Sequence, residues 1–235
     1  MSSNVEGFKY EQEVVDSLNA AGIAGNIKEG AGASSADADA DMILFGQRHL
    51  VEVKKDLYAQ MGGTSVRYVN GKFEPVGEAV DGDTFDIVAS ALDTKREHLD
   101  RLLDFLGSKS FPLTCEKDAW TTAKVAGLLQ PINIKVRKDT SFLVDHYSSK
   151  GVDYIQIGGA GLFYLKENPA GLPVPKLQGE IDIELRAGRS GSRKSGGVAV
   201  VGGSLRAQGR LKFSGSSPYT LDDKDSINNM LEYIK

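Results

Sequence analysis

The chain has 235 residues, of which 40% are hydrophobic and 26% charged, and its formal net charge is −4. This composition is ordinary for a globular protein and excludes a coiled coil, collagen and a wholly disordered chain, and no apolar run approaches the roughly 20 residues that a membrane span needs. Cys115 is the single cysteine and no signal peptide is visible, so we expect a cytoplasmic protein without an internal disulfide.

The first half of the chain predicts a helix, a loop and then a hairpin. Phe8, Val15 and Leu18 share one face of a 3.6-residue period, which indicates a helix over residues 5–21. The predicted segments that follow are a loop at 28–40, strands at 41–45 and 49–55, and an irregular region at 56–82 with a short hairpin at Asn70-Gly71.

The second half begins helical and becomes rich in strands. We expect helices at 84–106, 116–129, 139–149 and 223–234, the last with Asp222 or Asp223 as N-cap, and strands at 132–136, 153–157, 162–166, 180–186, 198–206 and 209–213.

The hairpin over residues 41–54 carries the residues with chemical potential. A two-residue loop at Gly46-Gln47, in a type II′ turn, would place Asp41 directly opposite Glu52, with Lys54 on the same face. Adjacent carboxylates repel each other, and a hard cation such as Mg²⁺ relieves the conflict by binding an oxygen of each. A lysine beside such a metal can orient a water or offset charge on a phosphate.

A third carboxylate supports this interpretation. Glu11 falls three residues after Phe8 and four before Val15, on the apolar stripe of the first helix, whereas Glu13 falls on the solvent side. A carboxylate that points into a core needs a partner, and a metal cluster would supply one. The alternative is structural: Asp41 simply begins a strand, and Glu52 and Lys54 form an exposed ion pair.

Glu11, Asp41 and Glu52-Val53-Lys54 together resemble the PD-(D/E)XK nuclease superfamily. The resemblance covers residues 5–63 and departs from the pattern at Ala40, where the family has proline. It implies a restriction-endonuclease-like αβββαβ core within an α/β fold, completed by a helix at 84–106 or 139–149 and a strand at 152–157. The segments after Glu52 are similar to those of phage-encoded or restriction-type endonucleases.

The resemblance also implies roles for individual residues. Asp41, Glu52 and the backbone carbonyl of Val53 would bind Mg²⁺, with Mn²⁺ as a substitute, and Glu11 would join them. Lys54 would assist the attacking water, and Gln60 matches a glutamine that some members carry. Asp37 and Asp39 are alternatives to Asp41, although neither leads directly into the apolar strand.

The chain is unevenly charged, because residues 186–212 contain seven basic residues and no acidic one. The rest holds 21 basic and 32 acidic residues, a net charge of −11. Such a Gly/Ser-rich cationic segment suits contact with a polyanion, or else forms a solvated loop. The candidate nucleic-acid contacts are Arg186, Arg189, Arg193, Lys194, Arg206, Arg210 and Lys212.

From the sequence we therefore expect a Mg²⁺-dependent endonuclease acting on double-stranded DNA. Its core would span residues 1–157 with an insertion, and a β-rich extension would span 158–235. Two-strand cutting would favour a homodimer, and no membrane partner is expected. Two other functions stay open: a nucleic-acid-binding protein of the same fold with weak or no cleavage, and a phage or host interaction protein that works through its acidic body.

Overall fold

The computed structural model describes residues 3–27, 38–57, 60–76, 91–133, 135–139 and 141–234. These residues form a mixed α/β fold with two sheets, which confirms the expected class in its coarse form. The helices are α1 (Ser3–Ala20), η1 (Asp93–Lys95), α3 (Arg96–Phe105), α4 (Lys117–Val125), α5 (Gln130–Asn133), α6 (Ser141–Ser149) and α7 (Lys224–Tyr233).

Most of the strands are short, and the last two are long. They are β1 (Ala24–Ile27), β2 (Ala40–Leu44), β3 (Gln47–Lys54), β4 (Gln60–Val69), β5 (Lys72–Pro75), β6 (Ser110–Phe111), β7 (Leu113–Glu116), β8 (Val136–Asp139), β9 (Val152–Ile157), β10 (Gly161–Tyr164), β11 (Gln178–Ser195) and β12 (Val198–Ser214).

The chain divides into two compact units. The first contains residues 1–59, 139–181 and 211–235, and the second contains residues 60–138 and 182–210. The second unit is therefore inserted into the first at two places. This division differs from the boundary expected near residue 157, because the C-terminal residues return to the first unit.

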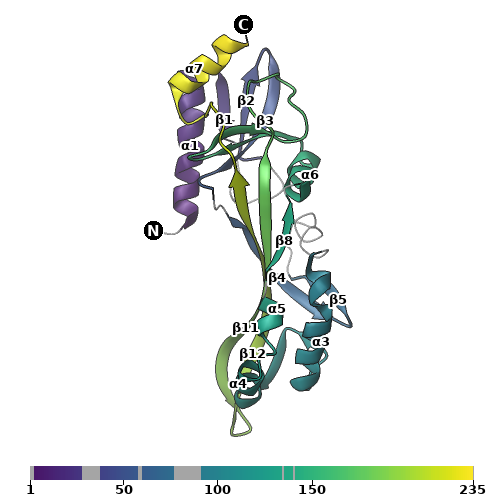
Figure 1. The fold of residues 1–235 in the computed structure, drawn as a ribbon. Helices are drawn as coiled ribbons and strands as arrows, with labels where there is room; N and C mark the ends of the chain where they lie inside the picture. Colours follow the sequence, from purple (N-terminus) through teal and green to yellow (C-terminus); the bar gives the residue numbers. More distant parts are fainter. Residues whose placement is uncertain are drawn as a thin grey trace. The chain divides into compact units, whose positions relative to one another are not determined.

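The sheet of the first unit has the strand order β1-β2-β3-β9-β10. Strands β1, β2 and β3 are antiparallel neighbours, whereas β9 runs parallel to β3. A parallel pair needs a crossover connection, and α6 lies in it, directly before β9 and packed against it. Helix α1 lies beside α7 and against the strands β1 to β3 (Figure 1).

The core of this unit explains why α1 forms where it does. Val14, Val15 and Leu18 are buried on one face of the helix, against Val51 and Val53 of β3. Phe8, expected on the same stripe, is instead 44% exposed.

The end of α1 is set by its backbone. Gly22 has a positive φ of 78°, and the N–H of Ile23 donates to the carbonyl of Leu18 at 3.0 Å. This is the Schellman arrangement, in which a glycine in the left-handed conformation satisfies the last helical carbonyls.

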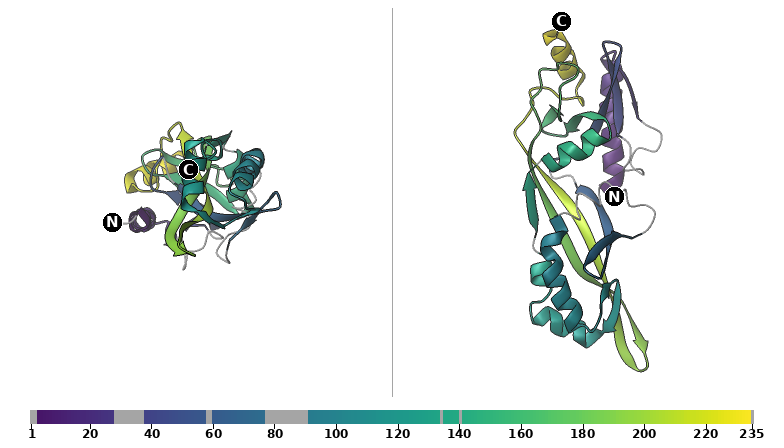
Figure 2. Two further views of the ribbon diagram at one scale, coloured as in Figure 1. Left: turned by 90° about the horizontal axis from the view of Figure 1, so that it is seen from below. Right: turned by 90° about the vertical axis from the view of Figure 1, so that its right-hand side faces the viewer.

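The sheet of the second unit has the order β5-β4-β12-β11-β8 and curls into an antiparallel half-barrel. Strand β6 pairs with β4, and β7 pairs with β12. The helices α3 and α4 and the β11–β12 hairpin of this unit can be followed in two views (Figure 2). Close packing requires Gly203 on β12, because an added Cβ would lie 2.8 Å from the Trp120 ring.

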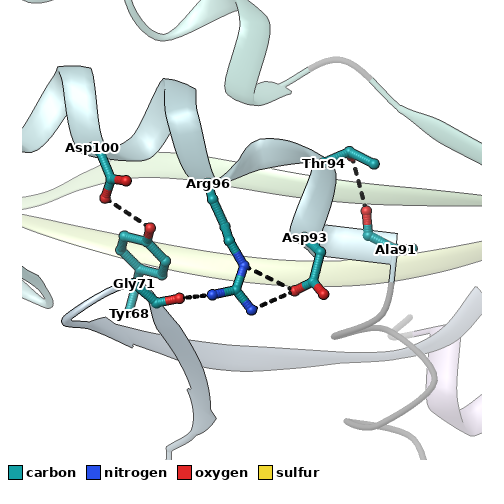
Figure 3. Close-up of polar contacts among 7 residues, drawn as sticks. All are labelled: Tyr68, Gly71, Ala91, Asp93, Thr94, Arg96 and Asp100. Carbon is teal, nitrogen blue, oxygen red and sulfur yellow. Dashed lines mark hydrogen bonds and ion pairs between the residues drawn. The ribbon is translucent and has the colours of Figure 1, made fainter.

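Polar contacts fasten the β4–β5 hairpin to α3 (Figure 3). The buried Tyr68 donates from Oη to Asp100 Oδ1 at 2.7 Å. Arg96 donates to the carbonyl of Gly71 at the hairpin turn and to Asp93 Oδ1 at 2.8 Å. The turn and the helix thus share one arginine.

Several sequence expectations fail in the second unit. Residues 60–75, expected to be irregular, form β4 and β5, although the turn at Asn70-Gly71 is confirmed. The strand expected at 132–136 is wrong, since α5 ends at Asn133 and β8 begins at Val136. The two strands expected at 198–213 are one strand, whose pairing with β4 shifts register between Ala207 and Gly209.

Other expectations are confirmed or lie outside the described residues. Asp223 caps α7 and accepts from the N–H groups of Asp225 and Ser226. Residues 28–37 and 84–90, expected as loop and helix, are outside the described ranges. Among the residues that the structure describes, no helix is both long and apolar enough to cross a membrane.

Candidate active site and nucleic-acid interface

The pairing of β2 with β3 corrects the predicted register. Ala40 lies opposite Val51, and Asp41 lies opposite Leu50 rather than Glu52. The turn is Phe45-Gly46, not Gly46-Gln47, with positive φ values of 52° and 76°. Positive φ at both central residues is the type I′ geometry. A bulky residue such as Phe45 rarely adopts a positive φ. The sequence therefore predicted the turn one residue later, at Gly46-Gln47.

The corrected register brings Asp39 into the position that was predicted for Asp41. The first pair of the two strands is Ala40 with Val51. The next pair outward in the same register is Asp39 with Glu52. Asp39 Oδ2 accepts from the backbone N–H of Val53 at 2.9 Å and lies 3.7 Å from Lys54 Nζ. The shift of two positions keeps the same face of the hairpin, so on that face Asp39, and not Asp41, lies opposite Glu52.

Asp41 has a structural environment instead. Its Oδ2 accepts from Arg48 Nε at 2.7 Å, and its Oδ1 accepts from the backbone N–H of Asn26 at 3.2 Å. The carboxylate is buried and satisfied by these partners. Asp41 therefore ties β1, β2 and β3 together.

Lys54 is the centre of the candidate site. Its ammonium donates to Glu52 Oε1 and lies 5.7 Å from the centre of the Tyr147 ring on α6. Burial lowers the pKa of Lys54, but Glu52, Tyr147 and Asp39 outweigh it and raise the pKa well above its usual value. The lysine is therefore held as a cation.

Burial disfavours the charged forms of two groups beside Lys54, the carboxylate of Glu52 and the phenol of Tyr147. Burial raises the pKa of Glu52, with Lys54 opposing. Burial also raises the pKa of Tyr147, so this phenol stays neutral and can donate a hydrogen bond. Tyr147 is buried, so its ring packs beside Lys54 in the core of this unit.

Glu11, the third predicted carboxylate, is buried on α1. Burial raises its pKa to about 7, and Asp39 and Glu52 add to this while Lys54 opposes it. Its Oε2 is buried and has no hydrogen-bond partner among the described residues. A buried oxygen without a partner costs free energy unless a ligand binds it.

A hydrogen-bond network holds α1 in place beside β9. The buried Gln156 donates from Nε2 to Tyr10 Oη at 2.9 Å, and Tyr10 donates to Asp222 Oδ2 at 2.6 Å. Tyr10 precedes Glu11 directly, so these bonds fix the part of α1 that carries the third carboxylate.

The remaining predicted site residues differ in their placement. The N–H of Val53 points to Asp39, and in a strand the carbonyl of the same residue points to the same edge, so the Val53 carbonyl is directed toward Asp39. Gln60 begins β4 in the second unit, and its side chain lies outside the described residues.

The donor set is chemically suited to a hard divalent cation. Carboxylates and backbone carbonyls are ligands that Mg²⁺ and Mn²⁺ prefer. The Oε2 of Glu11 has no hydrogen-bond partner among the described residues, and such an ion would be a suitable partner for it. However, within the described ranges no three Asp, Glu, His or Cys side chains lie close enough to one another to coordinate a single metal ion. The ammonium of Lys54 bonds to Glu52 instead.

The basic segment is a pair of strands and not a loop. Arg186 pairs with Glu184 at 3.1 Å, and Arg210 Nε is buried. Lys212 is partly buried and engaged in a contact of its own. The remaining members of the segment are exposed and make no ion pair with another described residue: Arg189, Arg193, Lys194 and Arg206.

Comparison with protein-family models, with curated proteins and with solved structures found no match to this chain.

Proposed function

We propose that the chain is a metal-dependent nuclease whose site consists of Asp39, Glu52 and Lys54, with Glu11 and the Val53 carbonyl. The observation that carries the proposal is the buried pair itself: Lys54 donates to Glu52 and lies 3.7 Å from Asp39, and the buried Oε2 of Glu11 on α1 has no hydrogen-bond partner among the described residues. Several buried carboxylates around one lysine cost stability, and a functional role accounts for their presence.

The order of elements in the first unit supports the same proposal. Helix α1, strands β1 to β3, helix α6 and strand β9 follow the αβββαβ order that the family resemblance implies, with β9 parallel to β3. Residues 60–138 form the insertion between β3 and α6. In this assignment Asp39 replaces Asp41 as the first acid, and Ala38 takes the place of the family's proline.

The chemistry is the hydrolysis of a phosphodiester. A water oxygen bonds to phosphorus as the ester bond to the leaving oxygen breaks, which gives a phosphate monoester and a hydroxyl. A divalent ion held by Asp39, Glu52, Glu11 and the Val53 carbonyl would lower the pKa of a bound water. Because Lys54 is held as a cation, its part is to orient that water and to offset negative charge on the phosphate, not to remove a proton.

The two candidate acids make the sharpest test. Asp39→Asn should reduce Mg²⁺-dependent cleavage of plasmid DNA by roughly 100-fold or more, the usual scale for losing a group that stabilises the transition state. Asp41→Asn keeps the shape of a residue that contacts Arg48 and should reduce stability more than chemistry. Equal loss in the two variants, after correction for the folded fraction, would contradict the assignment of Asp39.

A nucleic-acid-binding protein without cleavage is the second candidate. The ion pair between Lys54 and Glu52, with no ready-made cluster of three acids in the described part of the chain, favours it. EDTA separates the two functions, because a nuclease loses activity in EDTA while a binding protein keeps its affinity for DNA.

A further inference from the structure

The middle of the basic segment is an exposed hairpin. Residues 189–198, here called the arm, are exposed throughout, on both β11 and β12. The hairpin turns at Gly196-Gly197, which have positive φ values of 58° and 83°. In Figures 1 and 2 the tip of this hairpin extends beyond α4.

The base of the arm is firmly held. Strand β7 pairs with β12 from Val200 to Gly203, and Val201 is buried there. Gly203 packs against Trp120, with no room for a Cβ. The arm therefore projects as an ordered two-stranded ribbon from an anchored base, although its own side chains bury nothing.

The side chains of the arm are of a single kind. Arg189, Arg193 and Lys194 are its charged residues, no acid occurs from Arg186 to Lys212, and the others are serine, glycine and one valine. Arg189 and Arg193 share one face of the strand, and Lys194 lies on the other. Because the whole chain has a net charge of −4, a polyanion would be attracted only by a local surface such as this one.

We infer that the arm enters the major groove of double-stranded DNA and places its basic side chains on the phosphates at both groove walls. The inference rests on the proposed function only for the choice of nucleic acid as partner. Arg189 to Ser195 span roughly 20 Å of strand, and the groove, about 12 Å wide, admits a two-stranded ribbon. Small serine and glycine residues let the backbone approach closely.

The composition also argues against other partners. Single strands are held by stacking on aromatic side chains, and the arm has none. The major groove of duplex RNA is too narrow and deep for a ribbon. Protein interfaces have an apolar or aromatic centre, for which Val198 alone is available.

The test measures binding of a labelled 30-base-pair DNA duplex to the full chain in EDTA, so that cleavage cannot interfere. The variant carries Arg189→Ser, Arg193→Ser and Lys194→Ser. At 0.1 M salt its affinity should fall by roughly tenfold or more, and the slope of log affinity against log salt should become shallower by up to about 2.7, which is 0.9 for each lost contact. An unchanged melting temperature checks that the fold is intact.

The matched control changes the charge equally at exposed lysines of the same unit outside the arm: Lys72→Ser, Lys109→Ser and Lys135→Ser. Its affinity should stay within about twofold of wild type. Equal losses in both variants, no loss in the arm variant, or no duplex binding by wild type would overturn the inference. So would an equal loss for single-stranded DNA or duplex RNA.

The outcome for the arm is separable from the outcome for the proposed nuclease. Arm-dependent binding by a wild type that does not cleave with Mg²⁺ would refute only the nuclease. Cleavage by wild type together with unaltered binding by the arm variant would refute only the arm.

Discussion

Glu11 links the stability of the fold to pH. Its pKa is raised to about 7, first by burial and then by Asp39 and Glu52, against an ordinary value of 4.5. Between these values the folded chain binds more protons than the unfolded chain, so the stabilisation from this group is complete below pH 4.5 and is lost as the pH rises through about 7.

Glu11→Gln should remove this dependence. In EDTA we expect the variant to have a higher free energy of unfolding than wild type near pH 8, and this difference should shrink as the pH falls toward 5. Urea titrations at a series of pH values measure it. A difference between the two proteins that stays constant with pH would mean that Glu11 has a normal pKa in the folded state.

Much of the candidate site could be predicted from single residues. Glu52, Lys54 and the inward placement of Glu11 follow from alternation along a strand and periodicity along a helix. The choice between Asp39 and Asp41 could not be predicted in this way, because it depends on which two residues form the hairpin turn. That turn contains Phe45, and a phenylalanine with positive φ contradicts the propensity on which the prediction relied.

At the scale of elements, that same turn supplies a stability prediction. Phe45 has a φ of 52°, a backbone conformation that is unfavourable for phenylalanine, and its ring is 68% exposed. Burial of the ring therefore does not offset the unfavourable backbone conformation. Asparagine tolerates this conformation and is preferred before glycine in a type I′ turn. Phe45→Asn should therefore raise the free energy of unfolding by about 1 kcal/mol, measured by urea denaturation.

Phe105→Asn is the control for that substitution. Phe105 is also half-exposed, at 46%, but it lies in α3 with a helical backbone. Asparagine there should stabilise nothing. A gain of similar size in both variants would attribute the effect to the loss of an exposed aromatic ring and not to the turn.

The elements that sequence reasoning missed were short or paired over long distances in the chain. Strand β1 has four residues, and its pairing with β2 is not visible in its composition. Strand β4 pairs with β12 across more than half of the chain, and such pairing leaves no local signal. Helix α7 was predictable because its cap, Asp223, acts within three residues.

At the scale of the whole molecule, the two proposals fall on different compact units. Lys54 belongs to the first unit and the arm to the second, and the partners given above for Lys54, namely Glu52, Asp39 and Tyr147, also belong to the first unit. Changes at sites that share no partner usually add in free energy to within about 0.5 kcal/mol. The two activities are therefore expected to be separable by substitution.

A double-mutant cycle tests this independence. Lys54→Ala should lower the turnover number by roughly 100-fold or more while leaving affinity for DNA nearly unchanged, and the arm variant should do the reverse. Lys55→Ala is the control for the lysine, since Lys55 follows the end of β3 and pairs with Glu6 on α1. In the combined variant the losses in kcat/KM should multiply. A departure of more than about 1 kcal/mol from that product would show that binding by the arm and catalysis at Lys54 are energetically coupled.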